Sequence, residues 1–150
     1  MATGTPASIL VCDDEAHIRH IIVHKLRGAG FTVAEARNGQ EALSLLDPGE
    51  RQFKPDLVIS DLQMPLISGL EFCKVLKHRS DTSRTPVLML TARGYILTEE
   101  ELAETNIRRV ISKPFGVRQL LERVVELLAG IDPGLLPETL RQEEGQSAAA

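Results

Sequence analysis

Five polar residues in this 150-residue sequence have the same local context, because each follows a short apolar run. They are Asp13 and Asp14 after "SILVC", Asp61 after "LVIS", Thr91 after "VLML" and Lys113 after "RVIS". Carboxylate oxygens are the ligands that a hard divalent cation such as Mg²⁺ prefers. A lysine and a hydroxyl can hold the oxygens of a tetrahedral anion. This set therefore suits phosphoryl transfer, with an aspartate as nucleophile and an acyl phosphate as product.

The apolar runs have the length and aliphatic content of strands that are buried on both faces. They are Ser8–Cys12 and the runs that begin at Phe31, Leu57, Val87 and Arg109. Segments with helical periodicity lie between and after them, and the clearest of these contains Leu120, Leu121, Val124, Val125 and Leu128. The alternation predicts an α/β fold: a doubly wound, flavodoxin-like sheet of five parallel strands in the order 2-1-3-4-5, with five helices on both faces.

A doubly wound sheet binds ligands outside the carboxyl ends of its strands, where the strand order reverses. The first and third strands are neighbours at this point, so we expect Asp14 and Asp61 to face each other. Clustered carboxylates raise at least one pKa in the cluster unless a cation neutralises them. The pattern therefore predicts a magnesium site at this edge of the sheet.

Composition and charge argue against several classes of protein. The formal net charge of −4 at pH 7 does not favour a nucleic-acid-binding surface, which is normally basic. No apolar run approaches the roughly 18 residues of a membrane span, and the opening "MATGTPA" lacks the features of a secretory signal. Cys12 and Cys73 lie in apolar surroundings without metal-type spacing, so we expect reduced core residues in a cytoplasmic protein.

The same pattern predicts the domain boundaries. We expect residues 1–7 to be a flexible N-terminus and residues 8–129 to form one domain. Residues 130–150 contain prolines and glycines early and end in a polar, alanine-rich stretch. They are too few for a second domain, so we expect a short, mobile C-terminal tail.

Four motifs occur in order at the ends of predicted strands: "VCDDE", "ISDLQMPLISG", "LTA" and "SKPF". Together they resemble the receiver domain of two-component response regulators, a CheY-like fold, and the resemblance covers residues 8–129. It implies that Asp61 is the phosphoacceptor and that Thr91 and Lys113 hold the phosphoryl oxygens. It also implies a cis bond between Lys113 and Pro114, which proline permits.

The resemblance also implies a cofactor, Mg²⁺. Its protein ligands would be Asp14 and Asp61 directly, Asp13 mostly through water, and the backbone carbonyl of Gln63. The implied phosphoryl donor is a histidine kinase or a histidine phosphotransfer protein. The domain would not be a conventional enzyme, although it would help to catalyse its own phosphorylation and dephosphorylation.

Three functional hypotheses stay open from the sequence. The first is a stand-alone receiver that signals, or relays phosphoryl groups, through contacts with an unidentified protein target and not with nucleic acid or membrane. The second is the receiver part of a longer regulator. The third is a phosphatase of the haloacid-dehalogenase type, which places its nucleophile as Asp-x-Asp after the first strand, where this sequence has "CDDE".

Two features depart from the family pattern or add to it. Many relatives carry an aromatic residue three positions before the lysine, where this sequence has Val110. Tyr95 could substitute for that aromatic, but an exposed tyrosine with no switching role is the favoured interpretation. His17, His20 and His24 recur at helical spacing, and we interpret them as a solvated helix face that could dock a partner, in preference to a metal site or a pH sensor.

Overall fold

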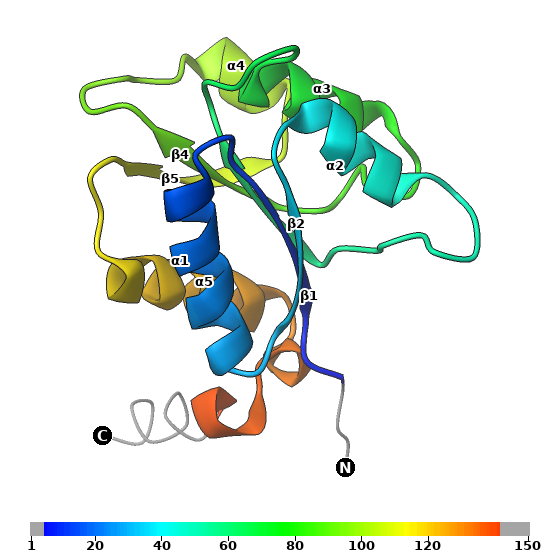
Figure 1. The fold of residues 1–150 in the computed structure, drawn as a ribbon, viewed down its shortest axis with the longest axis vertical. Coiled ribbons are helices and arrows are strands. Elements are labelled where there is room, and N and C mark those ends of the chain that lie inside the picture. Colours follow the sequence, from blue (N-terminus) through cyan, green and yellow to red (C-terminus); the bar gives the residue numbers. More distant parts are fainter. Residues whose placement is uncertain (1–4, 142–150) are drawn as a thin grey trace.

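Five parallel strands form the centre of the molecule in the computed structural model, which describes residues 5–141 (Figure 1). The sheet has the order β2-β1-β3-β4-β5, as predicted. The strands are β1 (Ser8–Cys12), β2 (Thr32–Ala36), β3 (Leu57–Asp61), β4 (Val87–Thr91) and β5 (Ile107–Ser112). Every residue of the two central strands β3 and β4 is buried, which explains their uninterrupted apolar sequences.

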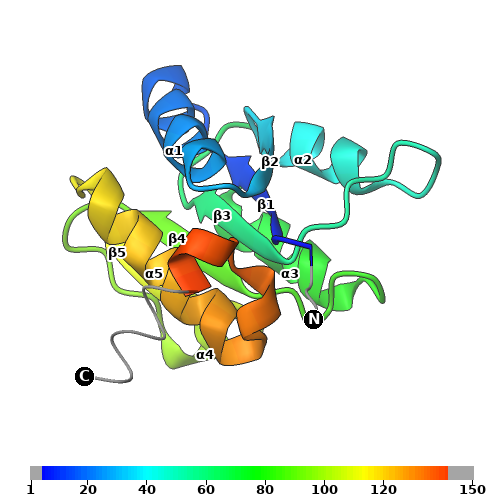
Figure 2. The ribbon, with the colours of Figure 1, turned by 90° about the horizontal axis from the view of Figure 1, so that it is seen from below.

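Helices cover both faces of this sheet (Figures 1 and 2). The helices are α1 (Ala16–Gly28), α2 (Gly39–Leu46), α3 (Gly69–His78), α4 (Glu99–Ala103) and α5 (Val117–Ile131). The apolar stripes of α1 and α5 contribute to one core cluster, and those of α2 and α3 contribute to a second. The predicted α/β fold with helices on both faces is therefore confirmed.

Strand register brings the carboxyl ends of the strands to one edge of the sheet. Cys12 pairs with Ser60, and Asp61 pairs with Leu90. At the next junction Thr91 pairs with Ser112, and the Lys113 amide donates to the Thr91 carbonyl at 2.7 Å. The polar residues that follow the strands therefore lie at the carboxyl edge, as the sequence predicts.

At the opposite, amino edge of the sheet, the two ends of the described chain meet. Ala7 is buried, and its amide donates to the Leu135 carbonyl at 2.8 Å. After α5 comes a short 3-10 helix, Pro133–Leu135, and Leu136 is completely buried in the core cluster that includes residues of α1 and α5. Figure 2 looks onto this end of the molecule, where the C-terminal segment in orange and red lies next to α5.

Residues 130–141 therefore pack against the domain in this structure, and their mobility stays a prediction. The prolines and the glycine end the helix, but the leucines between them bury apolar surface that holds the segment in place. Residues 1–4 and 142–150 lie outside the described residues, so the expectations for them stay predictions.

The two cysteines are free and buried, as predicted. Burial raises the pKa of the Cys12 thiol and of the Cys73 thiol to about 12, so both are protonated at neutral pH. Within residues 5–141, no helix combines the length and the apolar character that a membrane crossing requires.

Candidate functional site

Three carboxylates meet at the carboxyl edge of the sheet. Asp13 follows β1 and is completely buried, and Asp61 is the last residue of β3 with 5% of its surface exposed. Carboxylate oxygens of Asp13, Glu15 and Asp61 all lie within 4.8 Å of one another. Such a cluster of oxygen ligands matches the donor set that Mg²⁺ prefers.

The predicted pairing of Asp14 with Asp61 differs in detail from this arrangement. Asp14 is exposed and lines the same open cleft as Asp61, but its carboxylate is not part of the close cluster. Glu15, the residue directly before α1, takes that place. Sequence reasoning missed Glu15, although its position in "VCDDE" was the available signal.

Lys113 is the cation at the centre of the cluster. Its Nζ lies 3.3 Å from Asp61 Oδ1, 3.5 Å from Asp13 Oδ2 and 3.4 Å from Glu15 Oε1. Burial by itself would lower the pKa of Lys113, but the charges of Asp13 and Asp61 outweigh burial, and the pKa is raised. The lysine therefore stays charged and is shared among three acids.

One lysine does not neutralise three carboxylates. Burial, and then the charge of Asp13, raise the pKa of Asp61 to about 6, although Lys113 opposes the shift. Burial also raises the pKa of Asp13, against the opposing effects of the Glu15 amide and Lys113. The site holds an excess of negative charge that a cation would relieve.

Two buried oxygen atoms at this edge have no hydrogen-bond partner among residues 5–141: Asp13 Oδ2 and Thr91 Oγ1. Buried polar atoms normally have hydrogen-bond partners, and one explanation for an atom without one is a site that a water, an ion or a ligand occupies. Asp13 Oδ2 is suited to a metal-bound water or the metal, and the Thr91 hydroxyl can donate to an anionic oxygen. The residues present therefore fit both Mg²⁺ and a phosphoryl group.

The loop after Asp61 approaches the site so closely that it requires a glycine. A Cβ atom on Gly69 would lie 2.1 Å from the Asp61 carbonyl oxygen. The Gly69 amide donates to the Leu62 carbonyl at 2.7 Å, and the Ser68 side chain accepts from the Glu71 amide to begin α3. The start of α3 therefore packs directly against the backbone of Asp61 and Leu62.

The remaining candidate residues take different positions. Gln63 lines the cleft beside Asp61, and the bond between Lys113 and Pro114 is cis, as expected. Val110 and Tyr95 are 43% and 40% exposed.

The three histidines of α1 are exposed, in agreement with a solvated face. His20 Nε2 lies 3.7 Å from Glu35 Oε1. Among the described residues, no histidine belongs to a cluster of three ligand side chains with metal-binding spacing.

Residues 9–125 match the protein family described as the response regulator receiver domain. The chain belongs to this family. Its members accept a phosphoryl group on an aspartate, and this receiver domain carries the corresponding acidic pocket with Asp13 and Asp61.

Known proteins resemble this receiver domain in sequence and in structure. The alkaline phosphatase synthesis transcriptional regulatory protein SphR of Synechococcus elongatus is 37% identical, over 93% of this chain and 57% of SphR. The chain thus spans little more than half the length of this curated relative. The chemotaxis response regulator CheY4 of Vibrio cholerae is 33% identical with a TM-score of 0.72, over 81% of this chain and 98% of CheY4.

A further solved structure contains a metal. The response regulator TrrA of Thermotoga maritima, in complex with Mg²⁺-BeF, is 30% identical with a TM-score of 0.67, over 81% of this chain and 98% of TrrA. The family assignment favours a receiver over the haloacid-dehalogenase type of phosphatase, since both sequence and fold match receivers.

Proposed function

We propose that Asp61 accepts a phosphoryl group from the phosphohistidine of a histidine kinase or a histidine phosphotransfer protein. The observation that carries this proposal is the buried Asp61 carboxylate, held 3.3 Å from Lys113 beside two buried oxygens that have no hydrogen-bond partner among residues 5–141. With a pKa of about 6, Asp61 is mostly ionised at neutral pH and can act as a nucleophile.

In the transfer, a carboxylate oxygen of Asp61 attacks phosphorus while the bond from phosphorus to the donor imidazole nitrogen breaks. The bonding electron pair goes to that nitrogen, and an acyl phosphate forms on Asp61. Lys113 pairs with one phosphoryl oxygen, and the Thr91 hydroxyl donates to another. Lys113 is already at the site, 3.3 Å from Asp61, so it stabilises the charge without moving far.

The metal ligands in this proposal are Asp13, Asp14, Asp61 and the backbone carbonyl of Gln63. Bound Mg²⁺ would neutralise the excess negative charge of the acids and of the phosphoryl oxygens. The magnesium-containing complex of the similar protein TrrA supports this choice of ion. Glu15 is an alternative ligand, because its carboxylate lies nearer to those of Asp13 and Asp61 in the structure.

The partner that donates the phosphoryl group would dock over the cleft beside Asp61. Apolar side chains of α1 and of the segment before α5 line this cleft, including Ile18, Ile21 and Phe115. Ile21 is one of the large exposed hydrophobic residues, and such residues next to a reactive group are typical of protein contacts. As the sequence favours, we propose that the protein is cytoplasmic. Its target would be another protein and not a nucleic acid or a membrane.

Incubation with acetyl phosphate and Mg²⁺, followed by intact mass measurement, tests the phosphoacceptor. We expect one added phosphoryl group in the wild type and none in Asp61→Asn. Asp56→Asn is the matched control, because Asp56 precedes the same strand at the amino edge, where its carboxylate accepts from the Ser8 amide at 2.8 Å. Phosphorylation of Asp61→Asn at the wild-type level would contradict the proposal.

Two further variants test the metal ligands. We expect Asp14→Ala to abolish phosphorylation while the protein stays folded, as judged by circular dichroism. If Asp14→Ala keeps the wild-type rate and Glu15→Ala loses it, the metal is held by Asp13, Glu15 and Asp61 instead.

A further inference from the structure

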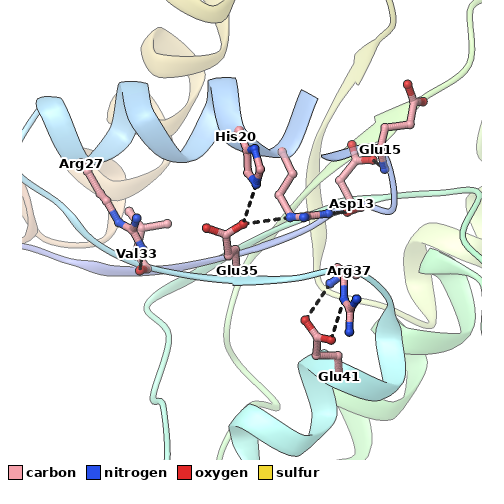
Figure 3. A network of polar contacts seen from close by, with 9 residues as sticks. Asp13, Glu15, His20, Arg27, Val33, Glu35, Arg37 and Glu41 are labelled. Carbon is pink, nitrogen blue, oxygen red and sulfur yellow. Dashed lines mark hydrogen bonds and ion pairs between the residues drawn. The ribbon is translucent and has the colours of Figure 1, made fainter. Parts of the chain in front are cut away.

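A buried arginine lies directly behind the acidic site. Arg19 belongs to α1, and its side chain is only 7% exposed. Its Nη1 donates to the Asp13 backbone carbonyl at 2.8 Å, and its Nε donates to Glu35 Oε1 at 2.9 Å. Figure 3 labels the two residues that accept these hydrogen bonds, Asp13 and Glu35, and shows Glu35 on β2.

Burying a guanidinium is unfavourable unless its donors have good partners. An apolar side chain would serve at this position if packing were its only purpose. The carbonyl that Arg19 binds belongs to the residue whose carboxylate contributes to the acidic site, so the contact acts on that residue's backbone.

Asp13 is held from several directions at once. Its amide donates to the Ala36 carbonyl at 3.1 Å, and its Oδ1 accepts from the Glu15 amide at 2.9 Å. Arg19 adds the third contact and ties this peptide to β2 through Glu35. Without it, nothing else among the described side-chain contacts binds the Asp13 carbonyl.

The other end of α1 provides a natural comparison. Arg27 also donates to a backbone carbonyl near β2, through Nη2 to Val33 at 3.0 Å (Figure 3). Arg27 is exposed, and Val33 has no part in the acidic site. The two arginines therefore make the same kind of contact, but only Arg19 makes it to a residue of the site.

We propose that Arg19 is a positioning residue for the phosphorylation site, with Glu35 as the group that orients it. The guanidinium holds the Asp13 peptide and so sets the directions of the Asp13 and Asp14 carboxylates toward Mg²⁺. Groups outside the direct ligand shell orient the ligands, and their loss commonly weakens metal binding by about 10- to 100-fold. The inference rests on the proposed function for the identity of the metal ligands.

The test is a Mg²⁺ titration of the full chain in which amide chemical shifts report binding. The melting temperature of each variant is measured separately without metal. For Arg19→Gln we expect the dissociation constant for Mg²⁺ to rise about tenfold. Arg19→Lys keeps the charge but has a single donor group, so it should restore part of the affinity. Arg27→Gln, the matched control, should bind Mg²⁺ as the wild type does, whatever its melting temperature.

Phosphorylation by acetyl phosphate at varied Mg²⁺ gives a second readout. We expect Arg19→Gln to need more Mg²⁺ than the wild type for half of its maximal rate. At saturating Mg²⁺, its rate should fall below the wild-type rate by a smaller factor than at low Mg²⁺. A lower melting temperature with a wild-type Mg²⁺ affinity would show a structural role only and would overturn the inference.

If Arg19→Gln does not fold, Glu35→Gln takes its place, because it keeps an acceptor and removes the charge that orients Arg19. A wild-type Mg²⁺ affinity in that variant would also overturn the inference. If the wild type itself accepts no phosphoryl group, the proposed function fails, while the direct Mg²⁺ titration still tests the role of Arg19.

Discussion

The two edges of the sheet solve opposite problems. At the carboxyl edge, Asp13 and Asp61 are buried beside one lysine, and two buried oxygens lack a hydrogen-bond partner within the described part of the chain. At the amino edge, Leu136 is buried in the core cluster to which α1 and α5 contribute, and the Ala7 amide donates to the Leu135 carbonyl.

This difference separates function from stability. Unpaired buried polar atoms and crowded acids destabilise a fold, and they persist where a ligand is to be bound. Apolar closure of the other edge supplies stabilisation without adding any group that a ligand could use. Perturbing the amino edge should therefore change stability alone, and perturbing the carboxyl edge should change stability and chemistry in opposite directions.

The largest effect is expected at the amino edge. Leu136→Ala should lower the free energy of unfolding by about 2–5 kcal/mol, because it leaves a cavity in the core. Urea unfolding measures the change, and Ile96→Ala, at an 84% exposed position, is the control with an expected change within about 0.5 kcal/mol. Phosphorylation of folded Leu136→Ala should match the wild type. Equal stabilities of the two variants would contradict the closure of this edge by Leu136.

A smaller effect of opposite sign is expected for Asp61→Asn in metal-free buffer. The pKa of Asp61 is raised from 3.8 to about 6, so its ionisation destabilises the folded state by at most about 3 kcal/mol. The protonated acid favours folding below pH 3.8, and this stability is lost as the pH rises through about 6. Asp61→Asn should therefore be more stable than the wild type at pH 7.5.

The pH dependence supplies the check. The advantage of Asp61→Asn over the wild type should shrink as the pH falls from 7.5 toward 4.5, and unfolding at each pH in EDTA measures it. Asp56→Asn, at the other end of β3, should show no such trend. An advantage that is constant with pH would mean that the charge of Asp61 is not the cause.

Magnesium should reproduce part of this stabilisation without a mutation. At a Mg²⁺ concentration ten times the dissociation constant, binding to the folded state contributes about 1.4 kcal/mol, which corresponds to a rise in melting temperature of about 3–6 °C. Differential scanning calorimetry with a control at the same ionic strength in NaCl measures it. Asp61→Asn should lose most of the rise, and Asp56→Asn should keep it.

The smallest effect is expected on the surface next to the site. Val110 is 43% exposed, so Val110→Ala should change stability by less than about 1 kcal/mol and leave phosphorylation nearly unchanged.

On phosphorylation, amide shifts should change most in the loop of residues 92–98, where Gly94 has a φ of +84°, and little around Val110. Thr91→Ala should keep phosphorylation but reduce the spread of these changes. A large rearrangement at Val110 that is lost in Val110→Ala would contradict this route.

Much of the fold was predictable from the sequence because its signals are local. Apolar runs of strand length alternate with stripes of helical period, and Thr98 and Glu101, three residues apart, form a capping box at the start of α4. The residue types at the ends of the strands were enough to predict phosphoryl chemistry and the edge of the sheet where it takes place. These inferences need only the directions of parallel strands.

The structure alone decided which side chains meet and how strongly their surroundings affect them. The close partner of Asp61 is Asp13 with Glu15, and not Asp14, because the direction of each carboxylate depends on the turn into α1 and on contacts with Lys113. The raised pKa of Asp61 follows from burial, which no local pattern records.

The same reason applies to the two longest-range features. Arg19, on α1, contacts Glu35 on β2 and Asp13 after β1. Leu136 is buried in a core cluster with residues of α1 and α5. From the sequence alone, Arg19 can be assigned to a helix and Leu136 can be recognised as an apolar residue, but nothing more can be said of either. Which groups they contact depends on segments that are distant in the sequence and adjacent only after folding.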